Sequence, residues 1–419
     1  MKTSGQHDSA YEVKTVVLLA IGFGLVGLDR WMIAPLFPYM MRDLGLNFQQ
    51  LGNLIGVLAI AWGAWAIASG PISDRFGRKK ILVSTMIAFS VLSSFSGLAN
   101  GFAGLMLIRG IMGIAEGAFT PASIAATSEA SLPSRRGFNL GFQMSMFSLL
   151  GLGFAPILAT QLLRVLPSWH WVFMVSAAPG LVVALLCAKM LRDRPRSTLV
   201  ATNSRGRSKG QWRSIFASRN VIVAIAAILC AMSGIFVIGA MVPTYLVAVL
   251  HLDAQSMGFV ASALGFGGFI GSFGLSGISD YLGRKTAAIG AFAVAAVLLF
   301  LFSRTGADPA KLFALLFGIS MCSIGLLSLL SGPIATEAAP AGLVASTIGV
   351  IAGLGEMFGG GVAPGIAGYI AQHFGLPHVF DFALGGLTLG GFVVLALVET
   401  APRCKRTAHA SIEEPRQAA

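Results

Sequence analysis

The chain has 419 residues, of which 55% are hydrophobic and only 11% are charged. Soluble domains carry about 25% charged residues because a globule must cover its surface, so this composition excludes a cytosolic enzyme, a nucleic-acid binder and a disordered protein. The net charge of +12 comes from bases concentrated in short polar joints between long apolar segments. We therefore expect a chain that lipid solvates over most of its length.

Apolar segments of about 20 residues recur along the chain, and each is long enough to cross the hydrocarbon core of a bilayer as a helix. Backbone in lipid must satisfy its own hydrogen bonds, and the alternating pattern of a β-barrel is missing, so these segments are predicted to be helices. The sequence predicts an all-α membrane protein with twelve transmembrane helices, at residues 15–38, 48–70, 81–99, 104–126, 138–164, 169–190, 221–248, 256–277, 286–303, 309–335, 342–371 and 378–400.

Basic residues are distributed unevenly over the joints between these spans. One set of joints holds the bases of residues 75–80, 135–136 and 191–220, whereas the other set holds only Arg42, Arg164, Arg304 and Lys311. Lys and Arg stay on the cytoplasmic side of short loops. With an even number of spans, we expect a multi-pass protein of the inner or plasma membrane with both termini in the cytoplasm.

A polar segment at residues 191–220 divides the chain into two parts. Between Arg192 and Arg219 it has eight bases against one acid, Asp193, as suits a flexible cytoplasmic linker near anionic lipid. The predicted organisation is an N-terminal tail, a six-helix bundle, the linker, a second six-helix bundle and a C-terminal tail, at residues 1–14, 15–190, 191–220, 221–400 and 401–419.

The same type of joint follows the second span of each half. The two joints read Gly70-Pro-Ile-Ser-Asp74-Arg75-Phe-Gly77-Arg78-Lys79 and Gly277-Ile-Ser-Asp280-Tyr-Leu-Gly283-Arg284-Lys285. Asp74 and Asp280 are 206 residues apart, and a second pair of acids, Glu129 and Glu337, is 208 residues apart. Two markers with nearly the same offset indicate a tandem repeat of six spans.

This joint resembles the Gly-x-x-x-Asp-Arg-x-Gly-Arg-Lys loop that is the most specific motif of the major facilitator superfamily. The resemblance covers about residues 15–400 and implies two pseudo-symmetric six-helix bundles that face one another across a central cavity and rock to alternate access. On this resemblance, the conformational-switch loops consist of Gly70, Asp74, Arg75, Gly77 and Arg78 in the first half, and of Asp280, Gly283 and Arg284 in the second.

Five charged residues lie inside predicted spans: Asp29 and Arg30 in the first, Arg109 and Glu116 in the fourth, and Glu356 in the eleventh. A charge at the bilayer centre costs ~2.5–3.5 kcal/mol on insertion scales, so each is a functional candidate. We expect Asp29 to pair with Arg109. We expect Glu116 to pair with Arg30, which would leave none of these four charges unpaired. Because buried ion pairs stabilise a fold less than apolar packing does, we interpret both pairs as switchable and not as static struts.

Protonation of Glu116 would release Arg30 for the carboxylate of a substrate, to which a guanidinium binds with two hydrogen bonds. Proton and anion would then bind with positive coupling, the thermodynamic basis of symport. Asp29 could carry a second proton. Glu356 lies in a Gly- and Pro-rich stretch, and both a coupling role and a structural role are open for it.

Three segments resemble the anion:cation symporter branch of the superfamily: the Asp29-Arg30 pair followed by Pro35 and Pro38, the run from Arg109 through Gly113, Glu116 and Gly117 to Pro121, and Trp169-His170-Trp171-Val172-Phe173. Members of this branch move organic anions such as sugar acids and sialic acid. The resemblance implies that Asp29 and Glu116 are proton sites, that Arg30 contacts the substrate and that Arg109 is the charge partner of Asp29.

Other polar candidates in the central spans are few. Gln143 and Tyr245 could hydrogen-bond a substrate and Trp62 could stack on one, although helix packing is an alternative role for each. This scarcity favours a substrate with an apolar or aromatic body.

Together these features predict a transporter and not an enzyme, with no catalytic residue, cofactor or metal: proton-coupled uptake of a small organic anion, such as an aromatic or sugar acid, by alternating access. The expected partners are the anion, H⁺ and the lipid bilayer, with no nucleic acid, and the protein is expected to be monomeric. Alternatives are proton-coupled export of a drug-like or lipid-like amphiphile and, outside transport, a membrane sensor. The residues do not distinguish H⁺ from Na⁺ as the coupling ion.

Overall fold

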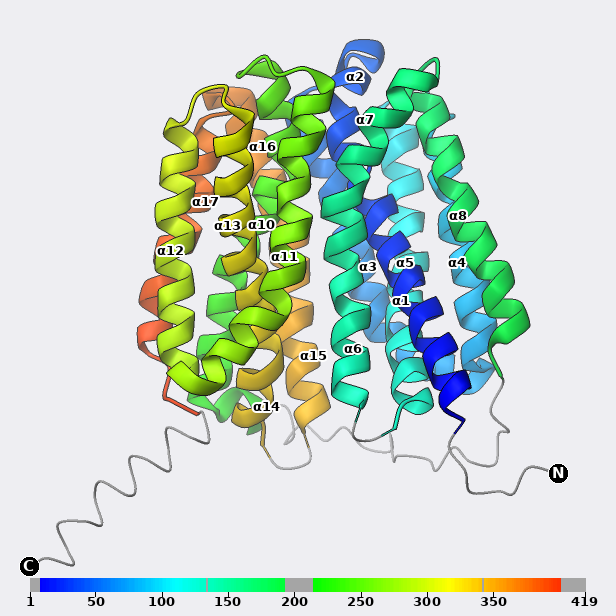
Figure 1. The fold of residues 1–419 in the computed structure, drawn as a ribbon, viewed down its shortest axis with the longest axis vertical. Helices are drawn as coiled ribbons and strands as arrows, with labels where there is room; N and C mark the ends of the chain where they lie inside the picture. The colour runs from blue at the N-terminus through cyan, green and yellow to red at the C-terminus, as the bar shows by residue number, and fades with distance from the viewer. Residues whose placement is uncertain (1–7, 133–134, 193–213, 341–342, 401–419) are drawn as a thin grey trace, which may run out of the picture.

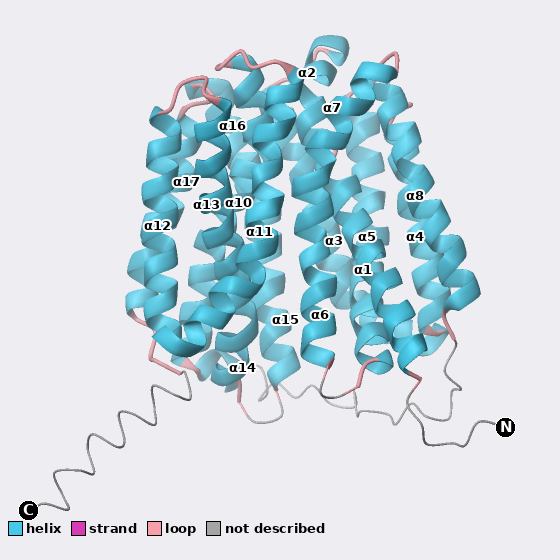
Figure 2. Ribbon diagram, in the orientation of Figure 1, coloured by secondary structure: helices cyan, strands magenta, loops and turns pink. Residues whose placement is uncertain are grey.

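The computed structural model describes residues 8–132, 135–192, 214–340 and 343–400, and within these ranges it leaves out the side chains of residues 67–76 and of Ala345. All the secondary structure of the described residues is helical (Figure 2). Residues 1–7 of the predicted N-terminal tail, residues 193–213 of the predicted linker and the whole predicted C-terminal tail lie outside the described residues.

The first half of the chain forms α1 (Ser9–Trp31), α2 (Ile33–Leu44), α3 (Phe48–Phe76), α4 (Arg78–Ser96), α5 (Phe102–Ala130), α6 (Arg136–Met146), η1 (Phe147–Phe154), α7 (Ala155–Val165) and α8 (Trp169–Met190). The second half forms α10 (Arg219–Ala248), α11 (Ala254–Leu282), α12 (Arg284–Arg304), α13 (Pro309–Leu329), η3 (Leu330–Ile334), α14 (Ala335–Ala338), α15 (Val344–Gly355), η4 (Glu356–Val362), α16 (Ala363–Phe374) and α17 (His378–Leu395).

These elements combine into rods that cross the molecule from end to end (Figure 1). Among the described residues, eleven helices are long and apolar enough to span a membrane, with α1 and α2 counted as one. The helix α3, at 29 residues, extends about 43 Å at 1.5 Å per residue, which is long enough for a twelfth span. The described chain begins and ends at the same face, the lower one in Figure 1.

Most helices extend beyond their predicted spans, and at α1 and α11 a polar residue caps the extended start. Asp8 accepts a hydrogen bond from the Tyr11 amide at 3.0 Å, so α1 begins well before the predicted residue 15. Asp253 caps α11 in the same way, by accepting from the Gln255 amide at 3.1 Å. Such caps satisfy amides that have no partner inside the helix, and apolarity alone does not locate them.

In the part of the chain that the structure describes, three membrane-spanning rods contain a stretch of π-helix: η1, η3 and η4. Each has a proline inside it or just after it, at Pro156, Pro333 or Pro364. A proline removes one helical hydrogen bond, and π-helical turns are common at functional sites. Because η1 begins at residue 147 and η4 at residue 356, they interrupt equivalent rods of the two halves.

The two bundles meet along α3 with η4 and α16, and along η1 and α7 with α11. Glycines allow the closest approaches between them. A Cβ atom on Gly52 would overlap the carbonyl oxygen of Pro364, and one on Gly265 would overlap the backbone nitrogen of Gly153. These contacts bring the backbones of the two bundles together where α3 meets α16 and where η1 meets α11.

Candidate functional site

The five charged residues predicted to lie inside the membrane are all buried. Their exposed fractions are 2% for Asp29, 3% for Arg30, 1% for Arg109, 0% for Glu116 and 7% for Glu356. Two lie at the end of α1, two on α5, and one at the first residue of η4. The site is therefore built from both bundles.

Arg30 forms its ion pair with a residue of the opposite bundle. Its Nη2 atom donates a hydrogen bond to Oε1 of Glu356. This differs from the predicted pairing of Arg30 with Glu116. The prediction considered only partners on the first and fourth spans, whereas the docking of the second bundle brings the start of η4 to the end of α1.

Aromatic rings surround the guanidinium of Arg30. Its Cζ atom lies 5.2 Å from the ring centroid of Phe236 and 5.9 Å from those of Trp31 and Phe147. Ring faces at these distances attract a cation. The Nε atom of Arg30 is buried without a hydrogen-bond partner in the described structure, so the guanidinium has donor capacity left for a ligand.

Asp29 and Arg109 make other contacts than the predicted ion pair. The Oδ1 atom of Asp29 accepts a hydrogen bond from Oγ of Ser93 at 3.0 Å. Arg109 donates from Nη1 to the carbonyl oxygen of Arg30 at 3.0 Å. Because α1 ends at Trp31, its last carbonyls are open to such an outside donor. Among the described residues no ion pair joins Asp29 to Arg109, although each lies within the electrostatic influence of the other.

Glu116 is fully buried, and neither carboxylate oxygen has a hydrogen-bond partner among the described residues. Two donors of Arg109, Nε and Nη2, are unpartnered in the same sense. Buried polar atoms are rarely left without partners, and each exception needs an explanation, such as a ligand or a proton. The site therefore has both hydrogen-bond donors and hydrogen-bond acceptors that no described residue uses.

The repeated joints have equivalent geometry in the two halves. Gly77 precedes α4 with φ of 92°, and Gly283 precedes α12 with φ of 93°. The Nε atom of Arg78 lies 2.8 Å from Oε1 of Glu129. In the second half, Nη2 of Arg284 lies 2.9 Å from Oε1 of Glu337. Each joint is thus tied to the end of the rod that lies two spans later in the same half.

Arg284 also pairs with Asp280, at 2.7 Å, as expected for a loop that holds both charges. The corresponding side chains of the first joint, Asp74 and Arg75, fall within residues 67–76 and so lie outside the described side chains, and Gly70 lies in the same segment. A role of these loops in conformational switching stays a prediction.

The sequence profile of the Major Facilitator Superfamily matches residues 19–360 of the chain. The chain belongs to this superfamily. Its predicted fold, of two pseudo-symmetric six-helix bundles, is confirmed by this match and by a solved structure. That structure is a bacterial homologue of the human lysosomal transporter Spinster in an inward-facing and unoccupied conformation. It has a TM-score of 0.70 and 19% sequence identity, over 94% of this chain and 95% of that one.

Two transporters of known name are similar in sequence to this major facilitator protein. A probable 4-methylmuconolactone transporter of Cupriavidus pinatubonensis is 26% identical over 94% of this chain and 92% of its own length. The D-galactonate transporter of Escherichia coli is 23% identical over 92% of this chain and 95% of its own length. Membership of the superfamily makes the protein a membrane transporter and not an enzyme, as predicted.

The other predicted substrate contacts are Gln143, Tyr245 and Trp62, and each has its own surroundings in this transporter. Gln143 is fully buried and donates from Nε2 to Oγ of Ser123 at 3.0 Å, with Oε1 unpartnered among the described residues. The ring of Tyr245 packs edge-on against Phe380, with centroids 4.7 Å apart, inside the second bundle. Trp62 is half-buried, and its indole N–H has no partner in the described structure. Gln143 and Trp62 thus retain free hydrogen-bonding atoms, whereas Tyr245 packs in an aromatic cluster.

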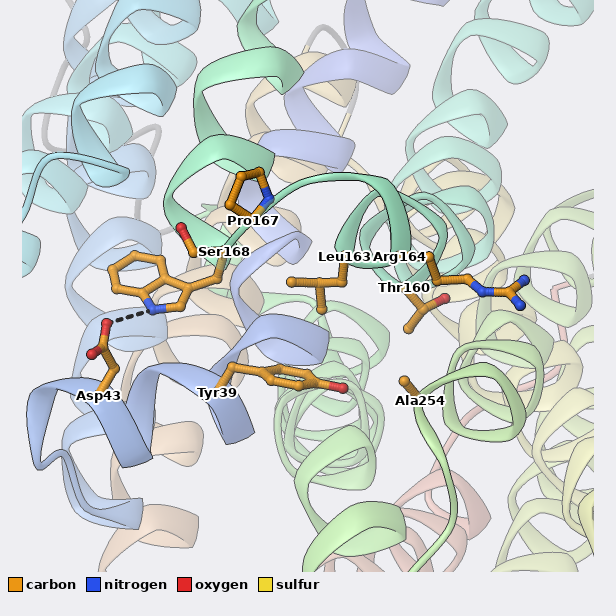
Figure 3. A pocket seen from close by; sticks show the side chains of 9 residues that line it. Tyr39, Asp43, Thr160, Leu163, Arg164, Pro167, Ser168 and Ala254 are labelled. Carbon is orange, nitrogen blue, oxygen red and sulfur yellow. Dashed lines mark hydrogen bonds between the residues drawn. The ribbon is translucent and has the colours of Figure 1, made fainter.

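A cavity of about 450 Å³ is lined by residues of α2, of α7 and of the joint between α7 and α8 (Figure 3). Tyr39, Arg164 and Trp169 are among its lining residues, and Nε1 of Trp169 donates to Asp43 at 3.0 Å across one side of it. None of the five buried charges lines this cavity, so it is separate from the charged site. A second void, next to Trp31, measures only about 10 Å³, which suffices for about one water molecule.

Sequence reasoning missed the neutral residues that complete the site. Ser93 hydrogen-bonds Asp29, and Phe147 and Phe236 cover Arg30. A serine or a phenylalanine in an apolar span carries no signal of its own. Phe147 opens η1, and the Gly151-Leu-Gly153-Phe-Ala155-Pro156 run that follows could have indicated an irregular helix there.

Proposed function

We propose that this major facilitator protein takes up a small organic anion together with protons by alternating access. The observation that supports this most directly is the buried Arg30, which pairs with a carboxylate of the opposite bundle and lies within the electrostatic influence of Glu116. Neither carboxylate oxygen of Glu116 has a hydrogen-bond partner among the described residues. A cation that exchanges carboxylate partners between two bundles can link anion binding to bundle movement. In this function protons are the coupling ion, and both ends of the described chain face the cytoplasm.

An organic carboxylate suits the site chemically. The guanidinium of Arg30 already binds one carboxylate and keeps its Nε atom free, and Arg binds carboxylates with two parallel hydrogen bonds. The aromatic rings of Trp31, Phe147 and Phe236 favour a substrate with an apolar or unsaturated body. Relatives named for the transport of 4-methylmuconolactone and of D-galactonate support an organic acid as the substrate class.

Charge balance supports coupling to protons. The site contains three carboxylic acids and two guanidinium groups, so full ionisation would leave one negative charge without compensation. An unpaired charge in a buried site is costly. We therefore place a proton on Glu116, whose carboxyl oxygens lack a partner among the described residues. Loss of this proton would make Glu116 a competing partner for Arg30 within the first bundle.

Asp29 is the second proposed proton site and Glu356 the third. Asp29 hydrogen-bonds the hydroxyl of Ser93, which in turn lies 3.2 Å from the hydroxyl of Ser176. Hydroxyl groups can donate to a carboxylate or accept from a protonated acid. Asp29 can therefore keep its hydrogen bond to Ser93 in either protonation state without moving. Arg109 supplies a positive charge nearby.

We place the lower face of Figure 1 in the cytoplasm of an inner or plasma membrane. The described chain begins and ends at that face, where Arg135 and Arg136 lie at the start of α6 and Lys189 lies in the last turn of α8. Lys and Arg in short loops favour the cytoplasmic side. We take the protein as a monomer and the two repeated joints as switch loops that form and break contacts as the bundles rock.

Proteoliposomes that contain the purified protein and an internal pH dye test this proposal, with D-galactonate and the 4-methylmuconolactone carboxylate as probes. An acid pulse outside should drive accumulation of at least one probe, and the probe should accelerate acidification inside. A sodium gradient at equal pH is the matched control. Accumulation that ignores the pH gradient, or that follows sodium alone, would reject proton coupling, and export under the same gradient would reject uptake.

A further inference from the structure

The ion pair between Arg30 and Glu356 places a carboxylate of the protein at the cation that the proposed function assigns to the substrate. Both partners are buried, with exposed fractions of 3% and 7%. Three aromatic rings cover the guanidinium, and the carboxylate of Glu356 approaches it on Nη2. No other carboxylate in the described structure forms an ion pair with Arg30.

We propose that Glu356 is a tethered substitute for the substrate anion. In this conformation its carboxylate occupies the anion site of Arg30, and a substrate carboxylate must displace it to bind. The inference rests on the proposed function, because it takes Arg30 as the anion receptor. Glu356 and the substrate carboxylate then compete for the same guanidinium.

The packing of η4 determines where this carboxylate lies. Gly360 leaves room for the pair, since a Cβ atom there would lie 2.8 Å from Nη2 of Arg30 and 2.7 Å from Oε1 of Glu356. A Cβ atom on Gly359 would overlap the Cβ atom of Met232 on α10. The backbone that carries Glu356 is therefore pressed against both the opposite bundle and its own. This packing keeps the backbone at Glu356 beside Arg30, within reach of the Glu356 side chain.

Displacement would also loosen the contact between the bundles. Arg30 belongs to the first bundle and Glu356 to the second, and theirs is the one ion pair between bundles among the described residues. A free anion on Arg30 satisfies the guanidinium without linking it to η4. Binding therefore exchanges a bond between the bundles for a bond to a mobile ligand, which lowers the cost of moving one bundle relative to the other.

Chemical rescue tests the inference without any transport assay. Glu356→Ala removes the carboxylate and leaves space beside Arg30 for a small anion, for which acetate is the probe. A ligand that binds the folded state raises its stability as its concentration exceeds Kd. We expect acetate to raise the Tm of Glu356→Ala by several degrees, saturably, and to change the Tm of the wild type little. Acetamide, which has the shape of acetate without its charge, should change neither.

The double variant Arg30→Ala/Glu356→Ala locates the acetate. It should lose the rescue, because the receptor is gone while the cavity remains. If acetate stabilises Glu356→Ala no more than wild type, or stabilises the double variant as strongly as the single one, the inference is overturned.

Glu356→Gln keeps the test decisive if the alanine variant does not fold. Its amide fills the same space without a charge, so it competes with acetate less strongly than the native carboxylate. We expect this variant to bind acetate at least ten-fold more tightly than wild type does, measured from the acetate dependence of Tm. Equal affinities would overturn the inference.

The two proposals fail separately. Proton-driven uptake of an organic anion together with failed acetate rescue would remove the tethered carboxylate and keep the transport function. Rescue at Arg30 together with the absence of anion or proton flux in the proteoliposomes would keep the anion site and reject the proposed function.

Discussion

Gly77 and Gly283 lie 206 residues apart and have nearly the same unusual backbone, with φ and ψ of 92° and 139° in the first half and of 93° and 149° in the second. Positive φ combined with extended ψ is essentially confined to glycine. Each glycine directly precedes the helix whose first arginine pairs with a glutamate of its own bundle. The internal repeat thus extends from sequence spacing to backbone conformation and charge pairing.

Replacing Gly283 with alanine should destabilise the protein, because a Cβ atom at this backbone conformation costs about 1–3 kcal/mol. The matched control is Gly290→Ala in the same rod, where a Cβ atom would meet nothing within 4 Å and φ is helical. That control should leave stability unchanged or raise it by about 0.5–1 kcal/mol. Thermal unfolding in detergent compares the two, and equal Tm values would show that the joint tolerates a side chain.

The Arg–Glu pairs of the two joints should contribute differently to the free energy of unfolding. Glu337→Gln removes the charge that pairs with Arg284, whose side chain is only 6% exposed. Hydrogen bonds to charged groups contribute about 1.5–3 kcal/mol, so we expect a loss of this size. Glu129→Gln should cost less, because Arg78 and Glu129 are 23% and 27% exposed and solvent screens exposed pairs. Chemical denaturation measures both, and a larger loss for Glu129→Gln would contradict this reasoning.

The sequence was sufficient to predict the membrane-spanning helices. Crossing a bilayer takes about 20 apolar residues, and backbone in lipid has few alternatives to a helix. It was also sufficient to select Asp29, Arg30 and Glu116 as buried charges, because an acid or base in such a span stands out. It could not predict which charges touch. The partner of Arg30 depends on how the second bundle docks, and η4 has no pattern that separates π-helix from α-helix.

The close approach of Gly265 to Gly153 should be needed for the two bundles to meet along α11 and η1. Gly265→Val would place atoms where the backbone of Gly153 lies, so the two bundles could not adopt this conformation. Gly274→Val on the same helix is the control, since a Cβ atom there meets nothing within 4 Å. We expect uptake by Gly265→Val to fall at least ten-fold while the control stays near wild type. Wild-type uptake by Gly265→Val would show that transport does not require this contact.

Asp253 should stabilise α11 only while it is ionised. A hydrogen bond from Ser256, together with the backbone amides at the start of the helix, lowers the pKa of Asp253. A lowered pKa in the folded state means that the stabilisation is complete above the unfolded pKa of about 3.9 and is lost as pH falls through the folded pKa. Asp253→Ala should therefore cost about 1 kcal/mol at pH 7 and progressively less in strong acid. Tm values of both proteins across this pH range would reveal it, and a constant difference would mean that the charge is irrelevant.

Glu116→Gln should separate anion binding from proton coupling. Gln is neutral, as we propose Glu116 to be in this conformation, so it preserves the state in which Arg30 is free of a partner on α5. Binding of D-galactonate or the 4-methylmuconolactone carboxylate should be retained or tighter, whereas accumulation driven by a pH gradient should fall at least ten-fold. Exchange of labelled probe across the membrane without a gradient should persist, because it needs no net proton movement. Full gradient-driven accumulation by Glu116→Gln would remove Glu116 from coupling and leave Asp29, with its serine partner on α4, as the remaining acid on the first bundle able to carry the proton.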